Sequence, residues 1–402
     1  MDLQSTEKEN EIEIENRNSN YKIEKVSTFE ELNLKENLLR GIYSYGFEKP
    51  SQIQQIGIQP VLENLDVIAQ SQSGTGKTAT FVISMLQRIN ENEQTTQGII
   101  LTHVRELALQ INNVVKSLSN FMNVNVSLTV GGTSIRDNIA ELNNNPHIVI
   151  GTPGRVLDMI NKKALNTRYL KLFVIDEADE MLSKIFLNQI YDIFRFLPQD
   201  IQVALFSATM NTEFFTLTKR FMRNPVELLL KNDELTLEGI KQFYVNVSLH
   251  EYKYECLCDL FDMVSISQSI IYCNSKRGVM DLVERLTNDD FSVLMMHGDM
   301  SQEERNGIMG KFRNGEGRIM VSTDLLARGI DIQQISIVLN YDLPNSIENY
   351  IHRIGRSGRY GRKGTAINFA TDNDIKKVTE LEQYYSTQIE PLPDKNILAS
   401  LL

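Results

Sequence analysis

The stretch LDVIAQSQSGTGKTATFVISMLQRI, residues 65–89, contains a short apolar run, a glycine-rich loop and a segment whose apolar residues recur at helical spacing. A strand, a loop ending in Gly-Lys-Thr and a helix form a site for phosphate, because backbone N–H groups and the helix N-terminus point at the anion. Lys77 is placed to reach the β- and γ-phosphates of a nucleotide, and the Thr78 hydroxyl to bind Mg²⁺. Ser71 stands where such a loop usually opens with Gly or Ala, at little steric cost. The loop residues expected to contact nucleotide are Ser73, Gly74, Thr75, Gly76, Lys77 and Thr78.

The rest of the chain repeats this alternation of apolar runs and helix-period segments from about Phe29 onward. Strands that alternate with helices imply βαβ units and a parallel sheet covered on both faces. The pattern stops at the charged connector LKNDELTLEG and then begins again. We expect two α/β domains of similar size, residues 29–228 and 241–402, with a linker at 229–240. The second domain has no phosphate loop of its own, so we expect a nucleotide to be shared across the cleft.

Composition restricts the class of protein. A chain of 402 residues, 42% hydrophobic, can bury cores for two or three domains. Its three cysteines, Cys256, Cys258 and Cys273, are too few for a disulfide framework or a four-ligand zinc site, which fits a reducing compartment. No apolar run approaches the roughly 18 residues of a membrane span, and the N-terminus lacks an apolar signal region. We expect a soluble intracellular protein without membrane association.

Charge restricts the mode of nucleic-acid binding. The net charge of −11 argues against a global positive field, although it allows a local basic track. Residues 1–28 are rich in Glu and Asn and poor in aromatics, so we expect a disordered acidic tail that solubilises the chain, or else a partner-binding arm.

A second chemical signal lies in KLFVIDEADEM, where an apolar strand ends in Asp176, Glu177 and Asp179. An aspartate in this position can hold Mg²⁺, partly through water, and the adjacent glutamate can orient or deprotonate an attacking water. Together with the phosphate loop, these carboxylates indicate nucleotide hydrolysis.

The motif Asp-Glu-Ala-Asp at residues 176–179 is similar to that of the DEAD-box ATP-dependent RNA helicases. Members of this family consist of two tandem RecA-like domains. GFEKPSQIQ is similar to the adenine-reading motif of that family, which implies that Gln54 hydrogen-bonds the adenine and that Phe47 supplies an aromatic contact. Ser207-Ala208-Thr209 matches the motif that couples hydrolysis to domain closure, together with Asp179. The resemblance covers about residue 29 to the C-terminus.

The second domain carries the motifs STDLLARGID and HRIGRSGR, which in this family complete the ATP site. The resemblance implies that Arg356 and Arg359 reach the ATP held by the first domain and stabilise the charge of the transition state. It also implies that Asp331 holds the ribose and that His352 contacts the first domain. Asp331 thus belongs to the ATP-binding residues. The implied catalytic residues are Lys77, Asp176, Glu177, His352, Arg356 and Arg359.

The resemblance further implies a grip on single-stranded RNA through phosphate and ribose, without reading of sequence. Each of the matching residues is a weak signal taken singly. The implied RNA-binding residues are Arg105, Gly131, Gly132, Thr152, Arg155, Asn274, Gly298, Asp299, Gln302, Arg305 and Thr323.

Two positions depart from the family pattern. His103-Val104 replaces a usual Pro-Thr, which removes a hydroxyl contact to the strand, and Ile185 stands where close relatives carry Gly.

Within the family, the chain resembles the eukaryotic initiation factor 4A group, which includes nuclear paralogues in exon-junction deposition and ribosomal RNA maturation. We expect an ATP-dependent RNA helicase that unwinds short duplexes, most readily in translation initiation, as a cytoplasmic or nuclear monomer with a scaffold-protein partner of the initiation-complex or exon-junction type. The alternative is a nuclear paralogue that acts as an ATP-gated RNA clamp in exon-junction complexes and splicing, or as a helicase in ribosomal RNA maturation. A metabolic phosphate-loop enzyme is a remote third.

Overall fold

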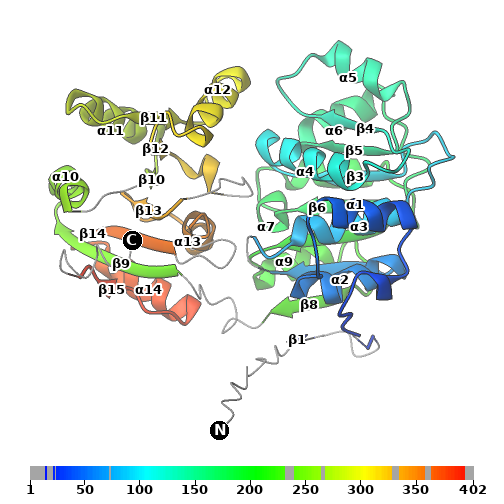
Figure 1. Cartoon of the computed structure of the whole chain (residues 1–402), viewed down its shortest axis with the longest axis horizontal. Coiled ribbons are helices and arrows are strands. Elements are labelled where there is room, and N and C mark those ends of the chain that lie inside the picture. The colour runs from blue at the N-terminus through cyan, green and yellow to red at the C-terminus, as the bar shows by residue number, and fades with distance from the viewer. Residues whose placement is uncertain are drawn as a thin grey trace, which may run out of the picture.

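A computed structural model describes residues 14–15, 21–22, 24–71, 74–230, 240–263, 268–327, 335–357 and 364–393. Two α/β units follow each other along the chain, each built on its own sheet (Figure 1). The predicted fold class of two mainly parallel α/β domains is confirmed.

The first unit is built on an eight-stranded sheet of order β1-β8-β2-β7-β6-β3-β5-β4. Every pair in it is parallel except the pairing of β1 with β8. The strands are β1 (Ile14–Glu15), β2 (Val67–Gln70), β3 (Gly98–Leu101), β4 (Val126–Thr129), β5 (Ile148–Gly151), β6 (Leu172–Asp176), β7 (Gln202–Ser207) and β8 (Val226–Leu230).

Helices cover both faces of this sheet, because neighbouring strand residues point to opposite sides and both sides are apolar. In β2, Val67 packs into one core and Ile68 into the other. The first core takes side chains from η1 (Glu30–Leu32), α1 (Glu36–Ser44), α2 (Gln52–Leu62), α3 (Lys77–Arg88) and α4 (Arg105–Leu118). The second takes them from α5 (Ile135–Leu142), α6 (Pro153–Asn161), α7 (Ala178–Met181), α8 (Leu187–Phe194) and α9 (Thr212–Thr218).

The second unit has a seven-stranded parallel sheet of order β11-β12-β10-β13-β14-β9-β15. Its strands are β9 (Ile240–Ser248), β10 (Ser269–Tyr272), β11 (Val293–Met296), β12 (Ile319–Ser322), β13 (Ile337–Asn340), β14 (Gly364–Thr371) and β15 (Glu390–Pro391). One face packs against α12 (Gln302–Arg313), α13 (Ile347–Ile354) and α14 (Ile375–Tyr385). The other packs against α10 (Lys253–Met263) and α11 (Lys276–Asn288), while η3 (His250–Tyr252) and η4 (Asp324–Leu326) are short connecting turns.

The N-terminal caps of two helices position two of the candidate site residues, Gln54 and Gln302. Ser51 and Gln54 form the start of α2, where the Ser51 N–H donates to Gln54 Oε1 at 2.8 Å. Ser301 begins α12 in the same way: its hydroxyl accepts from the Glu304 N–H, and its own N–H donates to Glu304 Oε2 at 2.7 Å. Such reciprocal caps satisfy backbone donors that the first helical turn leaves open. The two caps fix where Gln54 and Gln302 enter their helices.

The predicted boundaries can be compared with the elements. Ile14 and Glu15, inside the stretch expected to be a disordered tail, pair antiparallel with Leu230 and Leu229 of β8. Strand β8 ends at Leu230 and β9 begins at Ile240, so residues 229, 230 and 240 of the expected linker belong to strands. No helix in the described ranges is long and apolar enough to cross a bilayer.

Candidate functional site

The glycine-rich loop lies between β2 and the N-terminus of α3. Gly74 and Gly76 have φ angles of 85° and 109°, in the left-handed region that glycine adopts freely. A Cβ on Gly76 would lie 2.6 Å from Gln54 Nε2, so a side chain does not fit there. Helix α3 begins at Lys77, whose buried ammonium donates to the Ser71 carbonyl. Ser73 lies outside the described residues.

A cavity of about 350 Å³ opens at this loop. It brings together most of the residues predicted to hold ATP, and its Gln54 donates weakly to the Gly76 carbonyl at 3.4 Å. It also includes Tyr45, whose ring centroid lies 4.8 Å from that of Phe47. Sequence reasoning missed Tyr45, although an aromatic two residues before Phe47 was a usable signal. The lining residues are Tyr45, Phe47, Lys49, Ser51, Gln54, residues 74–79, Leu107, Gln110, Val114, Asp176 and Glu177.

The carboxylates of the DEAD stretch lie on the sheet side of this cavity. Asp176 is the last residue of β6, and its Oδ1 accepts the Glu177 N–H at 3.0 Å. Glu177 has a φ of 50°, an uncommon conformation for a residue with a side chain, which turns the chain sharply into α7. Both residues are only 3% exposed.

Burial and neighbouring charges govern the ionisation of this cluster. Burial raises the pKa of Asp176, the charge of Glu177 raises it further, and Lys77 opposes both effects. Burial lowers the pKa of Lys77, whereas the charges of Glu177, Asp176 and Asp179 raise it. Two buried carboxylates beside one ammonium leave net negative charge, which a cation with oxygen ligands would neutralise. The Thr78 hydroxyl and Asp176 carboxylate, which line the same cavity, fit the oxygen donors that Mg²⁺ prefers.

The third carboxylate connects the two units. Asp179 Oδ2 accepts the Thr209 hydroxyl at 2.6 Å and lies 3.2 Å from Nε2 of His352, on α13 of the second unit. His352 is 1% exposed, and its Nδ1 lies 3.9 Å from Glu177 Oε2. The Ser207 hydroxyl donates to the Thr209 carbonyl at 2.8 Å, which fixes the turn after β7. The structure thus brings together the residues predicted to couple hydrolysis to closure.

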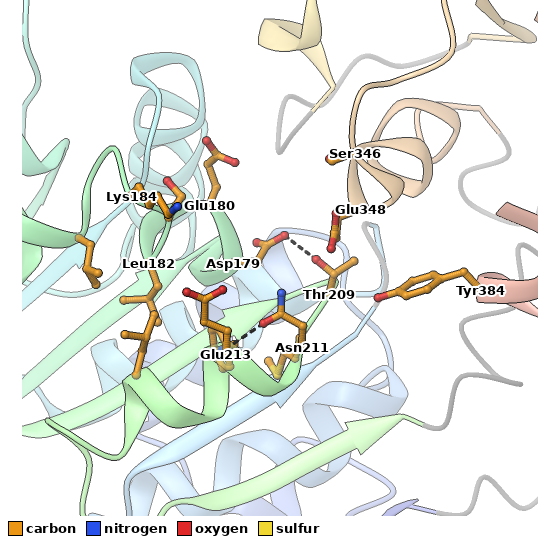
Figure 2. A pocket seen from close by; sticks show the side chains of 15 residues that line it. Asp179, Glu180, Leu182, Lys184, Thr209, Asn211, Glu213, Ser346, Glu348 and Tyr384 are labelled. Carbon is orange, nitrogen blue, oxygen red and sulfur yellow. Dashed lines mark hydrogen bonds between the residues drawn. The ribbon is translucent and has the colours of Figure 1, made fainter. Parts of the chain in front are cut away.

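A second pocket, of about 310 Å³, lies between the units beside this cluster. Figure 2 shows Asp179 and Thr209 joined by their hydrogen bond, with Glu348 and Tyr384 approaching from the opposite side. Glu213 also lines the pocket. Burial, and then the charge of Glu348, raise the pKa of Tyr384. None of this lining beyond Asp179 and Thr209 was predicted from sequence.

Arg356 follows α13 and is 1% exposed. Its Nε donates to the His352 carbonyl at 3.2 Å. Burial is the main cause of the lowered pKa of Lys77, and the positive charge of Arg356 adds to it. Arg359 and Asp331 lie outside the described residues.

Arginines from both units meet at the predicted RNA path. Arg105, the first residue of α4, lies against Gly132: a Cβ there would be 2.2 Å from Arg105 Nη1. Burial lowers the pKa of Arg105, the charge of Arg305 lowers it further, the charge of Glu106 raises it, and the charge of Arg155 lowers it. The charges of Arg105, Arg155 and Arg305 therefore lie close enough to influence one another.

The first-unit part of this path is hydrogen-bonded internally. The Gly131 N–H donates to the Thr152 hydroxyl at 3.3 Å, at the start of α6. Arg155 Nη2 donates to the Thr133 carbonyl at 2.9 Å.

The positions that depart from the family pattern lie at a helix start and on the surface. His103 and Val104 precede α4, and Val104 is the N-cap residue, without a side-chain cap. Ile185 is 71% exposed, and nothing in the structure explains it.

The second-unit part contacts Glu106 of the first unit. Arg305 Nη1 lies 3.1 Å from Glu106 Oε1, and Gln302 Nε2 donates to the same oxygen at 3.2 Å. The other guanidinium arm of Arg305 donates to the Gly298 carbonyl. Asp299, which is exposed, pairs with Lys276 at 2.5 Å. Sequence reasoning missed Glu106, which lies 199 residues from its partner.

Arg353 organises the remaining predicted contacts and was also missed. Its guanidinium is fully buried and donates to Asn274 Oδ1 at 2.7 Å, to the Asp342 carbonyl at 2.6 Å and to Asn340 Oδ1 at 3.1 Å. It also pairs with Asp324, which directly follows Thr323. Arg353 therefore holds Asn274 and the residue next to Thr323, and both Asn274 and Thr323 are predicted to bind RNA.

Comparisons with known proteins agree with this geometry. Residues 51–216 match the family model described as DEAD/DEAH box helicase, and residues 252–361 match the helicase conserved C-terminal domain. The chain belongs to the DEAD-box helicase family.

Its relatives share nearly its whole length. It is 56% identical over 369 residues to eukaryotic initiation factor 4A of Caenorhabditis elegans, covering 92% of each chain. It is 57% identical over 375 residues to the ATP-dependent RNA helicase eIF4A of Pyricularia oryzae, covering 93% of this chain and 94% of that one.

Solved structures share the fold. Dbp5 of S. cerevisiae bound to RNA and ADP BeF3 matches with a TM-score of 0.87 and 36% identity, over 93% of this chain and 97% of that chain. Mss116p bound to ssRNA and AMP-PNP matches with a TM-score of 0.83 and 28% identity, over 94% and 82%.

Proposed function

We propose that this protein is an ATP-dependent RNA helicase that closes its two domains on single-stranded RNA and locally melts short duplexes. The observation that carries the proposal is the division of one site between two domains. Lys77 and the DEAD carboxylates lie on the first domain, whereas His352 lies on the second and contacts Asp179 and Glu177. Arg356, also on the second domain, acts on Lys77 through its charge.

The cavity beside the phosphate loop is the ATP site. Gln54 offers an amide with both a donor and an acceptor for the adenine, and Phe47 and Tyr45 offer aromatic surface. The backbone of residues 74–77 and the Lys77 ammonium hold the phosphates. On nucleotide binding, Lys77 leaves the Ser71 carbonyl for phosphate oxygens. Mg²⁺, held by Thr78 and through water by Asp176, would neutralise charge on the phosphates.

Hydrolysis requires both domains. Glu177 orients or deprotonates the attacking water, and its left-handed backbone aims the carboxylate into the cavity. Arg356, with Arg359, stabilises the negative charge that spreads over the γ-phosphate oxygens. Because Asp179 binds both Thr209 and His352, loss of the γ-phosphate can be transmitted to the domain contact.

RNA binds along the path of Arg105, Arg155 and Arg305, through phosphates and without reading of base sequence. The affinity falls as salt rises, because each neutralised phosphate releases counterions. A basic path of this kind is compatible with a net charge of −11.

We further propose a role in translation initiation, in the cytoplasm, with a scaffold protein as partner. The names of the relatives support this choice over a nuclear paralogue. A translation extract depleted of its own factor tests it: restored initiation by this protein supports the role, and no restoration by an active helicase contradicts it.

The helicase proposal is tested by steady-state ATPase with and without single-stranded RNA, together with release of a strand from a short duplex. RNA-stimulated turnover with strand release supports it. ATP-dependent retention of RNA without turnover would instead identify an RNA clamp. If a folded, nucleotide-binding protein showed neither activity, both the helicase and the RNA clamp would be refuted.

A further inference from the structure

Ser71 occupies the junction between β2 and the phosphate loop, where a serine is not required by shape. It is 1% exposed and lies directly after Gln70, the last residue of the strand. The residue makes three contacts through three different groups, two with residues of the phosphate loop and one with the strand that ends at Ser207.

Two of these contacts are made by the backbone. The Ser71 N–H donates to the carbonyl of Ser207 at 3.0 Å, which joins the loop to the strand that carries the coupling motif. The Ser71 carbonyl accepts the Lys77 ammonium. Glycine or alanine at this position would keep both contacts, so neither of them explains the serine.

The third contact depends on the side chain. The Ser71 hydroxyl shares a hydrogen bond with the hydroxyl of Thr75, on the far side of the loop. Thr75 stands between Gly74 and Gly76, the two residues with positive φ. Glycines lose more conformational freedom on ordering than other residues, so this segment is the costliest part of the loop to hold in one conformation.

We propose that Ser71 is a positioning residue whose hydroxyl holds Thr75 and so pre-orders residues 74–76 of the phosphate loop for nucleotide. The inference rests on the proposed ATP site and adds a determinant of its affinity. A loop that is ordered before binding loses less entropy when phosphates arrive, which tightens binding. The hydroxyl bonds Thr75 and has no part in the hydrolytic step, so its removal changes affinity and leaves the chemical step intact.

Ser71→Ala is expected to weaken ADP and ATP binding about three- to tenfold, the effect of one net hydrogen bond. The turnover rate at saturating ATP and RNA stays within about twofold, so the change falls on KM. Thr75→Val removes the other hydroxyl at nearly equal volume. Adding Ser71→Ala to Thr75→Val is expected to cause no further loss, because the shared bond is already absent.

The measurement is the dissociation constant of a fluorescent ADP for the full chain, in the absence of RNA. Ser84→Ala is the matched control: Ser84 is a buried serine of α3 whose hydroxyl donates to the Thr80 carbonyl at 2.8 Å, away from the loop. The control is expected to bind ADP like the parent protein. Melting temperatures of all variants identify a general loss of folding.

Three results would overturn the inference: parental ADP affinity in Ser71→Ala, equal weakening in the Ser84→Ala control, or independent, multiplying losses in the double variant. Lys77→Ala separates these from failure of the site itself. Parental ADP affinity in Lys77→Ala would refute the assigned ATP site, whereas loss of binding there together with an unaffected Ser71→Ala would refute only the role of Ser71.

Discussion

The contact between Glu106 and Arg305 predicts how strongly the two domains hold each other without RNA. The charged groups are 3.1 Å apart, and their side chains are only 7% and 10% exposed. At an effective dielectric constant of about 20, their attraction is about 5 kcal/mol, from which the cost of desolvating both charges is subtracted. Glu106→Gln keeps a hydrogen-bonding oxygen for Arg305 and Gln302 but removes the charge.

We expect this substitution to shift the balance between closed and open forms by about 1–2 kcal/mol toward the open form, a factor of about 5 to 30. Single-molecule energy transfer between one dye on each domain measures the two populations directly. The exchanged pair Glu106→Arg with Arg305→Glu restores opposite charges across the same contact and is expected to recover part of the closed population.

An unchanged closed fraction in Glu106→Gln would refute this reasoning, as would a charge exchange no better than the single Glu106→Arg variant. Glu303→Gln is the matched control, since it removes a carboxylate from the exposed face of α12 beside the contact. It should leave the populations as they are in the parent protein.

Three further predictions concern the ATP site. Glu177→Gln is expected to lower RNA-stimulated hydrolysis at least about a hundredfold and to prolong the ATP-dependent RNA complex; hydrolysis at the parental rate would contradict its role. Arg356→Ala should reduce turnover by about a thousandfold or more while ADP affinity stays within about threefold, and normal RNA-stimulated ATPase would exclude it as the charge-stabilising arginine. Because the folded-state pKa of Asp176 is raised, its carboxyl opposes folding increasingly as pH rises from the ordinary aspartate value through the raised one. Asp176→Asn should therefore raise the melting temperature of the nucleotide-free protein more at pH 8 than at pH 5, and an equal rise at both would contradict that ionisation.

The parts of the site that are local in sequence were predictable. Asp176 ends a buried strand and Glu177 follows it, while Lys77 and Thr78 follow another buried strand across the glycine-rich loop. Period and spacing identify such strand ends. Parallel pairing then brings the two strand ends to the same edge of the sheet. The two-domain fold followed from the same alternation, and the structure confirms it.

The parts of the site that depend on contacts between residues far apart in sequence were not predictable. Arg353 draws its acceptors from separate segments of the second domain, and a single sequence contains no sign that they meet. Glu106 and Arg305 come together only when the domains do. In each case the interaction is a buried polar pair, which has no periodicity and no composition signature. Tyr45 was different, because its aromatic neighbour Phe47 was a local signal.

The lining of the ATP cavity has a consequence for inhibition. The described residues around it all lie between Tyr45 and Glu177, in the first domain. Under the proposed function, binding of nucleotide therefore depends on the first domain, whereas turnover depends on both domains. A compound that fills this cavity would compete with ATP however the domains are oriented. A compound bound between Asp179 and His352 would allow nucleotide to bind but prevent its hydrolysis. Added ATP would overcome inhibition by the first kind of compound and would not overcome inhibition by the second.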